Sequence, residues 1–421
     1  MIQHIFKIIW TERKMNSWIV FELVLVFCIL WFCVDYISFF MQRYFEPRGY
    51  TIEHVYTVNL GVKDASVLSN IESQEQQDSL INSVWTIIDR IKKYPDIEAV
   101  SISWAAIPYS GSYTNASVMI DSVEEFVQIK TVTPNFFKVF GMTVLQGNPT
   151  DWNNGNNVFI SGNNTNLFAK KDVTHLKTFN LWSRENEYSK TSVIGLISPS
   201  KRSEFDSADP IIYKLMGKND RELISIGGTE ICFKVKAGAD KNFISRFTKD
   251  MQEQLSVYPF YLSSLTSMSD LREDYMKQNG YDNNFKSIFA VSAFLFINIF
   301  LAVVGTFWFR IQTRRNEIGL RIALGSTRIN IKTLFIVEAL ILLFLASIVA
   351  TPVCVNIALA DILKDIGVPS ISKAENHITI GQYVINYCIT FSILMLTAII
   401  AVWYPAKKAS EIQPAEALHY E

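Results

Sequence analysis

The sequence predicts an integral membrane protein with four transmembrane helices and a large mixed α/β domain inserted between helices 1 and 2. Three observations support this fold class: long apolar runs without charges, a polar segment of strand and helix patterns after the first run, and basic residues gathered on short segments beside the runs. Overall the chain is 49% hydrophobic and 19% charged. Its mean hydropathy of +0.17 averages over very unequal parts.

Three apolar runs are long enough to cross a bilayer. They are Ile288 to Phe309, Ala339 to Ala360 and Tyr383 to Trp403. At about 1.5 Å rise per residue each can traverse a hydrocarbon core of roughly 30 Å. The middle helix is expected to begin earlier, near Ile331, and to tolerate Pro352 because neighbouring helices can satisfy the freed carbonyl. The predicted spans are therefore 287–309, 333–360 and 383–403.

The first spanning helix is predicted at 18–40. This run carries Glu22 and Asp35, which lie near its ends, where they can reach the membrane interfaces. A secretory signal is the alternative, since it also joins a basic start to an apolar run. The run is longer than a signal core, and no small-residue cleavage site follows it. An uncleaved anchor is the preferred interpretation.

The distribution of basic residues predicts the orientation. Lysine and arginine exceed acidic residues in the amphipathic segment 1–17 and in the loop 310–332, and the tail 404–421 begins with Lys407 and Lys408, whereas the loop 361–382 has no such excess. By the positive-inside rule, the first three are cytoplasmic, so segments 41–286 and 361–382 lie outside.

The outer domain is expected to fold around its own hydrophobic core. Of the five cysteines only Cys232 lies in it, and one cysteine cannot form a disulfide within the domain. A β-α-β unit is predicted at its start, because a helix-like run at 76–94 lies between two strand-like runs. The expected strands are 55–62, 97–102, 117–120, 126–132, 158–160, 192–197 and 230–235, and the expected helices are 76–94, 134–140 and 242–255. Sequons at 115–117 and 163–165 are interpreted as plain loops.

The last part of the domain, 268–286, is predicted to be a helical stalk that continues into the second span. A flexible linker is the alternative, and the lack of Gly and Pro from Ser269 to Gln278 favours the helix.

No catalytic constellation is present in the sequence. There is no phosphate-binding GxxxxGK[ST] loop, no HExxH zinc motif and no GxSxG nucleophile turn. The five histidines are scattered along the chain. We therefore expect no enzyme activity, no metal and no cofactor on this chain; if ATP and Mg are used, another chain binds them.

Four polar residues within the apolar runs require an explanation, because burying them in a membrane is costly. Glu22, Glu338, Asn298 and Asn356 could line a transport path. Alternatively, the two acids lie near the cytoplasmic interface, where they pair with basic residues or make capping contacts, and Asn298 makes an interhelical hydrogen bond. The second interpretation is preferred.

The basic loop 310–332 is the candidate functional site. Residues from Arg314 to Leu324 can form one helix that places Ile311, Ile318, Ile322 and Leu324 near one face, with Arg314, Glu317 and Arg321 largely away from it. Gly325 is placed as the residue after the helix, where a positive φ costs glycine little, and Ser326 or Thr327 can cap the next helix. From these properties alone, a contact with a soluble partner and a passive interfacial anchor remain open.

The stretch RRNEIGLRIALGST, Arg314 to Thr327, resembles the cytoplasmic loop of the MacB/FtsX-type ABC transporter permeases, which has an Arg-x-x-Glu-Ile-Gly-x-x-x-Ala-Leu-Gly pattern. Thr131 to Asn148 is similar to the outer-domain signature of that family, with Gly141 and Gly147. Tyr404 to Leu418 is similar to its C-terminal end. The order of one helix, an outer domain and three helices also agrees.

The resemblance implies the permease subunit of a bacterial inner-membrane transporter, which binds membrane lipid, a separate ABC ATPase and a second permease subunit, and no nucleic acid. It implies that the loop contacts the ATPase through Arg314, Arg315, Glu317, Ile318, Gly319, Arg321, Ala323, Leu324 and Gly325.

Two functions are consistent with this resemblance. The first is export or extraction of a peptide, antibiotic or lipid-linked molecule. The alternative is FtsX-like mechanotransmission without transport, which regulates a periplasmic hydrolase, adaptor or sensor. Whether the dimer joins identical or different permease subunits stays open, because this chain is a single permease unit.

Overall fold

The computed structural model describes residues 10–11, 13–162, 167–168, 171–172, 176–182, 188–225, 228–359 and 380–411. It divides into two compact units. One comprises Met1–Gln42 and Asp282–Glu421, and is called here the membrane unit; the other comprises Arg43–Tyr281, and is called the α/β unit. The sequon at 163–165, most of the loop 361–382 and most of the tail 404–421 lie outside the described residues.

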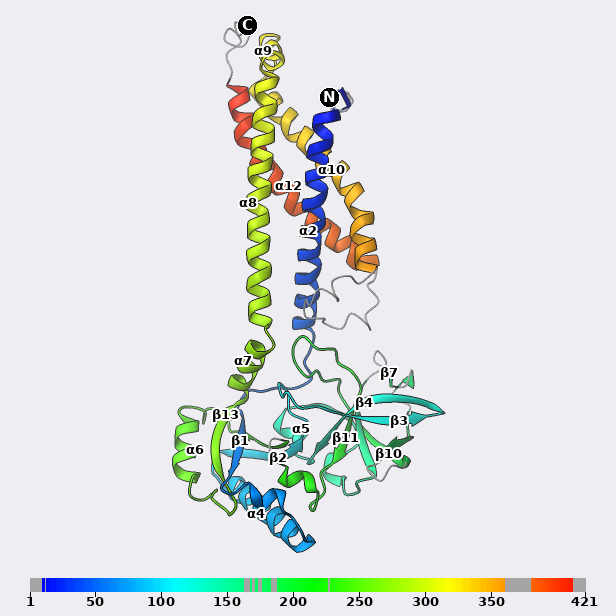
Figure 1. Cartoon of the computed structure of the whole chain (residues 1–421), viewed down its shortest axis with the longest axis vertical. Coiled ribbons are helices and arrows are strands. Elements are labelled where there is room, and N and C mark those ends of the chain that lie inside the picture. The colour runs from blue at the N-terminus through cyan, green and yellow to red at the C-terminus, as the bar shows by residue number, and fades with distance from the viewer. Residues whose placement is uncertain are drawn as a thin grey trace. The chain divides into compact units, whose positions relative to one another are not determined.

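The membrane unit consists of long helices and one short helix, which lies between two of them in the chain (Figure 1). They are α2 (Arg13–Phe45), α8 (Tyr281–Thr313), α9 (Arg315–Ala323), α10 (Arg328–Leu359) and α12 (Ile380–Ser410). Among the described residues, four stretches are long and apolar enough to cross a membrane: Asn16–Phe45, Tyr281–Thr313, Arg328–Ile357 and Gly381–Ser410. The fold class with four membrane helices is confirmed. Each helix is longer than its predicted span because polar end turns continue it beyond the apolar run.

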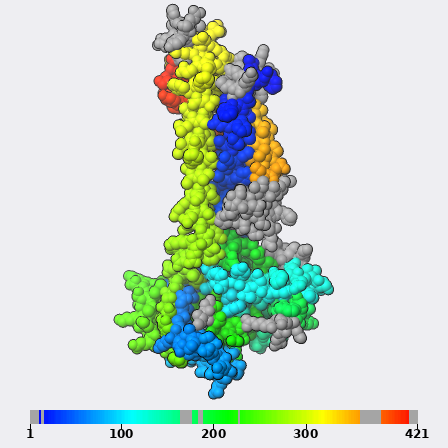
Figure 2. Space-filling model, viewed as in Figure 1, coloured from blue at the N-terminus to red at the C-terminus, as the bar shows by residue number. Residues whose placement is uncertain are grey.

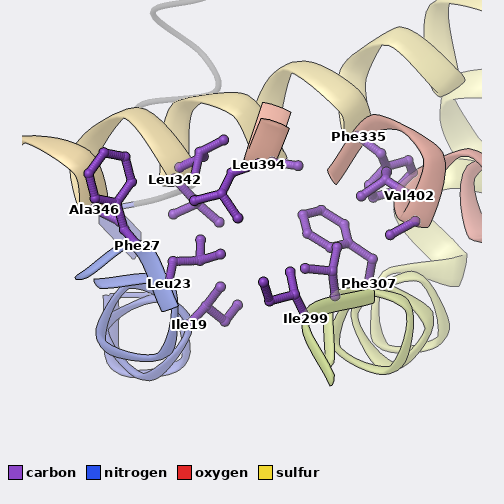
Figure 3. Close-up of a cluster of buried hydrophobic side chains, with 14 of the residues drawn as sticks. Ile19, Leu23, Phe27, Ile299, Phe307, Phe335, Leu342, Ala346, Leu394 and Val402 are labelled. Carbon is purple, nitrogen blue, oxygen red and sulfur yellow. The ribbon is translucent and has the colours of Figure 1, made fainter. Parts of the chain in front are cut away.

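All these helices contribute to one apolar core. Figure 3 shows side chains of α2 such as Leu23 facing Ile299 and Phe307 of α8, with α10 and α12 completing the cluster. Leu342 and Ala346 of α10 are fully buried there. Small residues such as Ala346 allow close helix approach, which is how membrane helices pack without a hydrophobic driving force.

Helix α8 also has an extensive exposed apolar face. Figure 2 shows it at the surface of the membrane unit along most of its length. Phe294 and Leu301 are 66% and 62% exposed. Apolar surface of this size is stable only when lipid or another membrane helix covers it.

Among the described residues, the α/β unit contains an extensive sheet and a separate two-stranded sheet within 167–172. The strands of the unit are β1 (Val55–Val62), β2 (Ile97–Trp104), β3 (Thr114–Ile120), β4 (Val123–Val132), β5 (Val144–Gln146), β6 (Asn157–Ser161), β7 (Leu167–Phe168), β8 (Lys171–Asp172), β9 (Thr178–Trp182), β10 (Tyr188–Ile197), β11 (Ile211–Leu215), β12 (Thr229–Val235) and β13 (Phe260–Ser267). Its helices are α3 (Ser66–Ser69), α4 (Gln74–Lys92), α5 (Phe136–Val139), α6 (Phe243–Met251) and α7 (Met268–Gln278), with short 3₁₀ turns η1 (Pro149–Asp151) and η3 (Arg221–Ile224).

The first part of the sheet has the order β2-β12-β1-β13. Helices α4 and α6 pack against one face of it, and Ile87 and Phe247 are fully buried in that layer. Helix α4 begins with a capping box, in which Ser73 and Gln76 exchange side-chain and backbone hydrogen bonds. The predicted β-α-β unit is confirmed, although β12 inserts between β1 and β2.

The second part of the sheet closes into a barrel. Following the pairings among the described strands gives the ring β4-β3-β9-β10-β6-β11, and β11 pairs again with β4 in parallel. Each strand of the ring contributes to one buried apolar cluster, which includes Val118, Ile160 and Ile212. The barrel joins the first part of the sheet through β2 and β4, at Ser103↔Val132 and Trp104↔Thr131.

The predicted continuous stalk is wrong in one respect, because the helix is interrupted. Helix α7 ends at Gln278, and the amides of Asn279 and Gly280 close its last turn by bonding to the carbonyls of Tyr275 and Lys277. Gly280 has a φ of +70°, a conformation that glycine adopts easily, and α8 then begins at Tyr281. The chain therefore passes from one unit to the other through a helix break.

Candidate functional site

The predicted loop helix is present as α9, and it ends in a Schellman motif. The amide of Ser326 donates to the carbonyl of Arg321 at 2.9 Å, and that of Gly325 donates to the carbonyl of Ile322 at 3.0 Å. Gly325 has a φ of +95°. The Thr327 hydroxyl then accepts the amide of Asn330 at 3.3 Å and caps α10. These contacts confirm the predicted roles of Gly325 and Thr327 in turning the chain.

Substituting Gly325 by alanine is expected to destabilise the turn by roughly 1–2 kcal/mol, the cost of a left-handed backbone for a residue with a side chain. The added methyl group would meet nothing within 4 Å, so the backbone alone causes the loss. Thermal unfolding in detergent measures it. The matched control is Gly305→Ala within α8, where there is also open space and alanine favours the helix. Equal stability of the two variants would contradict the role of the turn.

A buried carboxylate ties the end of α8 to α10. Glu338 of α10 is 1% exposed, and its two oxygens lie 3.2 Å from Arg310 Nη2 and 3.2 Å from Arg314 Nη1. Arg310 is completely buried and also donates to the Asn16 side chain of α2. A buried ion pair is stable only when its charges are matched and hydrogen-bonded. This cluster therefore links Arg314, at the start of the loop helix α9, to helices α2, α8 and α10.

A second carboxylate continues the cluster onto α9. Glu317 accepts Arg314 Nε at 2.9 Å and Arg321 Nη2 at 2.6 Å. Burial by itself raises the pKa of Glu317, but the hydrogen bonds and positive charges of the two arginines lower the pKa overall. Glu317 is therefore an anion that holds α9 against Arg314, and through Arg314 against Glu338.

The predicted contact residues divide into a buried and an exposed group. Ile318 and Gly319 are buried against the membrane helices, and Arg314 is 8% exposed. Arg315 and Arg321 are partly buried. Ala323, Leu324 and Gly325 are exposed. The buried residues can position α9 and the exposed ones can contact a partner directly, whereas the partly buried Arg315, Glu317 and Arg321 can do either.

Leu320 and Ile329 are two further exposed apolar residues, and they lie close to Leu324 in the sequence. Leu320, Leu324 and Ile329 are 51%, 78% and 73% exposed, and we call these three residues the loop surface. Leu320 and Ile329 are absent from the predicted site, although their place beside Leu324 in an otherwise polar loop could have indicated them. Large apolar side chains grouped on a surface mark contact sites.

Some expectations about the loop and its surroundings are wrong. Leu324 lies away from the buried face because the helix ends before it, and Arg314 is buried because Glu338 attracts it. Asn298 donates to the carbonyl of Phe294, and Asn356 to that of Pro352, within their own helices. The predicted interhelical bond of Asn298 is therefore not formed. The predicted pairing of Glu338 with basic residues is confirmed.

Comparison with known proteins identifies the membrane part of the chain. Residues 289–414 match the family model of the FtsX-like permease C-terminal domain. No match was found among curated proteins. The match over residues 289–414 confirms the resemblance to FtsX-type permeases for this part of the chain. Permeases of this ABC transporter family work with an ATPase.

Three solved structures resemble the chain over about half its length. The periplasmic region of MacB from Actinobacillus actinomycetemcomitans is 13% identical, with a TM-score of 0.33, covering 55% of this chain and 97% of that one. A domain of a putative permease from Porphyromonas gingivalis is 10% identical, with a TM-score of 0.32, covering 54% and 98%. The extracellular domain of the ABC-type transporter YknZ from Gram-positive bacteria is 12% identical, with a TM-score of 0.30, covering 49% and 98%.

Proposed function

We propose that this chain is the permease subunit of a bacterial ABC transporter, in which a separate ATPase binds the loop surface. ATP and Mg are bound by that ATPase, and its closure moves the α/β unit to export or extract a peptide, antibiotic or lipid-linked substrate. Two permease subunits form the working dimer in the cytoplasmic membrane, with both termini inside.

This proposal rests on one observation: the same short loop has an exposed apolar surface and is held at its start by a buried cluster of ion pairs. Leu320, Leu324 and Ile329 present about half or more of their area to solvent. The Glu338 carboxylate of α10 joins Arg310 of α8 to Arg314, which precedes α9. A force applied to α9 is therefore transmitted to α8 and α10 together. A passive anchor would not need this rigid base.

The test is affinity purification of the full chain in mild detergent, with a bound ATPase identified by its sequence and its ATP hydrolysis. Leu324→Asp introduces a charge into the loop surface, and we expect it to lower ATPase recovery at least about tenfold, the equivalent of 1.4 kcal/mol. Asn316→Asp is the matched control, because Asn316 is also exposed on α9 but lies outside the loop surface.

Two results would count against the proposal in different ways. Absence of any ATPase with the unmodified chain, under all nucleotide conditions, would contradict the permease function. Equal recovery with Leu324→Asp and Asn316→Asp would leave the permease function standing and contradict the loop surface as its contact.

A further inference from the structure

The α/β unit contains an open cleft of about 910 Å³ whose floor is the polar face of the first part of the sheet. Thr57, Asn59 and Thr266 of β1 and β13 line it. Thr57 and Thr266 are direct partners in the strand register. The opposite face of these strands packs into the apolar core through Tyr56 and Val58. Strand alternation thus gives the cleft a floor of hydroxyl and amide groups.

One wall of the cleft is the segment 107–113, which the structure holds firmly at its start. The Glu230 carboxylate is buried and accepts the Ser103 hydroxyl at 2.7 Å and the amides of Ala106 and Ile107 at 3.0 and 3.1 Å. Tyr109, with a φ of +60°, is in the left-handed region. Backbone of this kind persists only where its surroundings impose it, and it occurs often at binding sites.

A second part of the lining is helix α7. Leu271, Asp274, Tyr275 and Gln278 of this helix line the cleft. The buried ring of Tyr275 packs edge-on against Tyr109 at 5.8 Å between centroids, and so joins this helix to the segment 107–113. Both parts of the lining are therefore preformed, which lowers the entropic cost of binding a ligand.

The rim carries an aromatic platform. Tyr113 is 57% exposed, and the Arg202 guanidinium lies over its ring at 5.2 Å from the centroid. Arg202 is itself paired with Asp206 at 3.6 Å. The tyrosine ring therefore has one face supported by a cation, and it offers aromatic area at low entropic cost because it has few rotatable bonds.

The lining determines which ligand chemistry fits. Among the lining residues that the structure describes, the charged ones are Arg202, Glu230 and Asp274. Because these charges are few and of both signs, the lining favours neither a polyanion nor a polycation. Leu60, Ile107 and Leu271 are its aliphatic members, and the larger part of the exposed lining is polar. Hydroxyl and amide groups, which donate and accept, match a ligand covered with hydroxyl groups.

We infer that this cleft binds a short neutral oligosaccharide, with sugar hydroxyls bonded to the floor around Asn59 and to Gln278, and a sugar ring against Tyr113. The volume is suited to such a ligand, since clefts for compact ligands measure roughly 300–1,000 Å³. Binding itself requires no ATPase, so it goes beyond the proposed function and can be tested separately.

The test measures binding of fluorescently labelled malto-, cello- and chito-oligosaccharides to the full chain. The chain is held in lipid nanodiscs, because alkyl-glycoside detergents carry a competing sugar. We expect saturable binding of at least one oligosaccharide, weakened about tenfold by Tyr113→Ala and by Gln278→Ala. Phe126→Ala is the matched control, because this aromatic side chain is 77% exposed and lies outside the cleft lining.

Three outcomes would overturn the inference. One is that none of the oligosaccharides binds. Another is that Tyr113→Ala and Gln278→Ala bind as well as Phe126→Ala, which would place the sugar elsewhere. The third is that an uncharged peptide, tested in parallel, binds with the same dependence on Tyr113 and displaces the sugar, which would make the cleft a peptide site.

Discussion

Replacing Glu338 by alanine is expected to destabilise the membrane unit by about 3–5 kcal/mol, the usual cost of removing one partner from a buried ion pair. The variant would leave the guanidinium groups of Arg310 and Arg314 buried without the carboxylate that faces both at 3.2 Å. The charge imbalance, more than the lost packing, is the cause. Thermal unfolding of the full chain in lipid nanodiscs measures the effect.

The matched control for this prediction is Glu273→Ala. Glu273 also pairs with a basic residue, Lys277, at 2.6 Å, but both side chains are more than half exposed on α7. Exposed pairs of this spacing contribute only about 0.3–0.5 kcal/mol. If Glu338→Ala unfolds no earlier than Glu273→Ala, the buried cluster does not stabilise the base of the loop.

A rise in stability between about pH 8 and pH 10.5 is expected from Lys130 of β4. Complete burial lowers the pKa of this lysine from 10.5 to about 8, against an opposing effect from the negative Glu230. Between these two values the unfolded chain binds more protons than the folded chain, so the free energy of unfolding increases with pH. The shift corresponds to about 3 kcal/mol, at 1.36 kcal/mol per pKa unit.

Comparison of Lys130→Met with Lys214→Met isolates this effect. Lys214 lies on the neighbouring strand β11, opposite Thr131, but it is exposed. Between pH 8 and pH 10.5 the unmodified chain and Lys214→Met should both gain stability relative to Lys130→Met, a comparison in which the other titrating groups, such as the buried Cys232 thiol with its raised pKa, contribute equally. A rise of the same size in Lys130→Met would exclude Lys130 as its source.

Local sequence patterns predicted most of the helices and strands whose formation depends on residues close together in the chain. The strand β1 has the predicted bounds of 55–62, and α4 follows the spacing of Leu80, Val84 and Ile87. Two of the missed strands, β11 and β13, are held by partners far along the chain: β13 by β1, and β11 by both β4 and β6. Their own sequences carry a weaker signal, because pairing rather than intrinsic preference determines them.

The candidate site shows the same division. Gly325 and Thr327 were identified because turn and cap chemistry is local. The partners of Glu338 could be predicted only as basic residues, since choosing Arg310 and Arg314 requires knowing how α8 packs on α10. The exposure of Leu320 and Ile329 likewise depends on which face of the loop the membrane helices cover.

Closure of the barrel limits the association of the α/β unit with other proteins through unpaired strand edges. Unpaired strand edges are templates for unwanted association, and ring closure from β4 round to β11 removes them from that part of the sheet. Among the described strands of the main path, β13 is left as the terminal one. Its outer edge is therefore where strand addition by another chain, and aggregation after partial unfolding, would be expected to start.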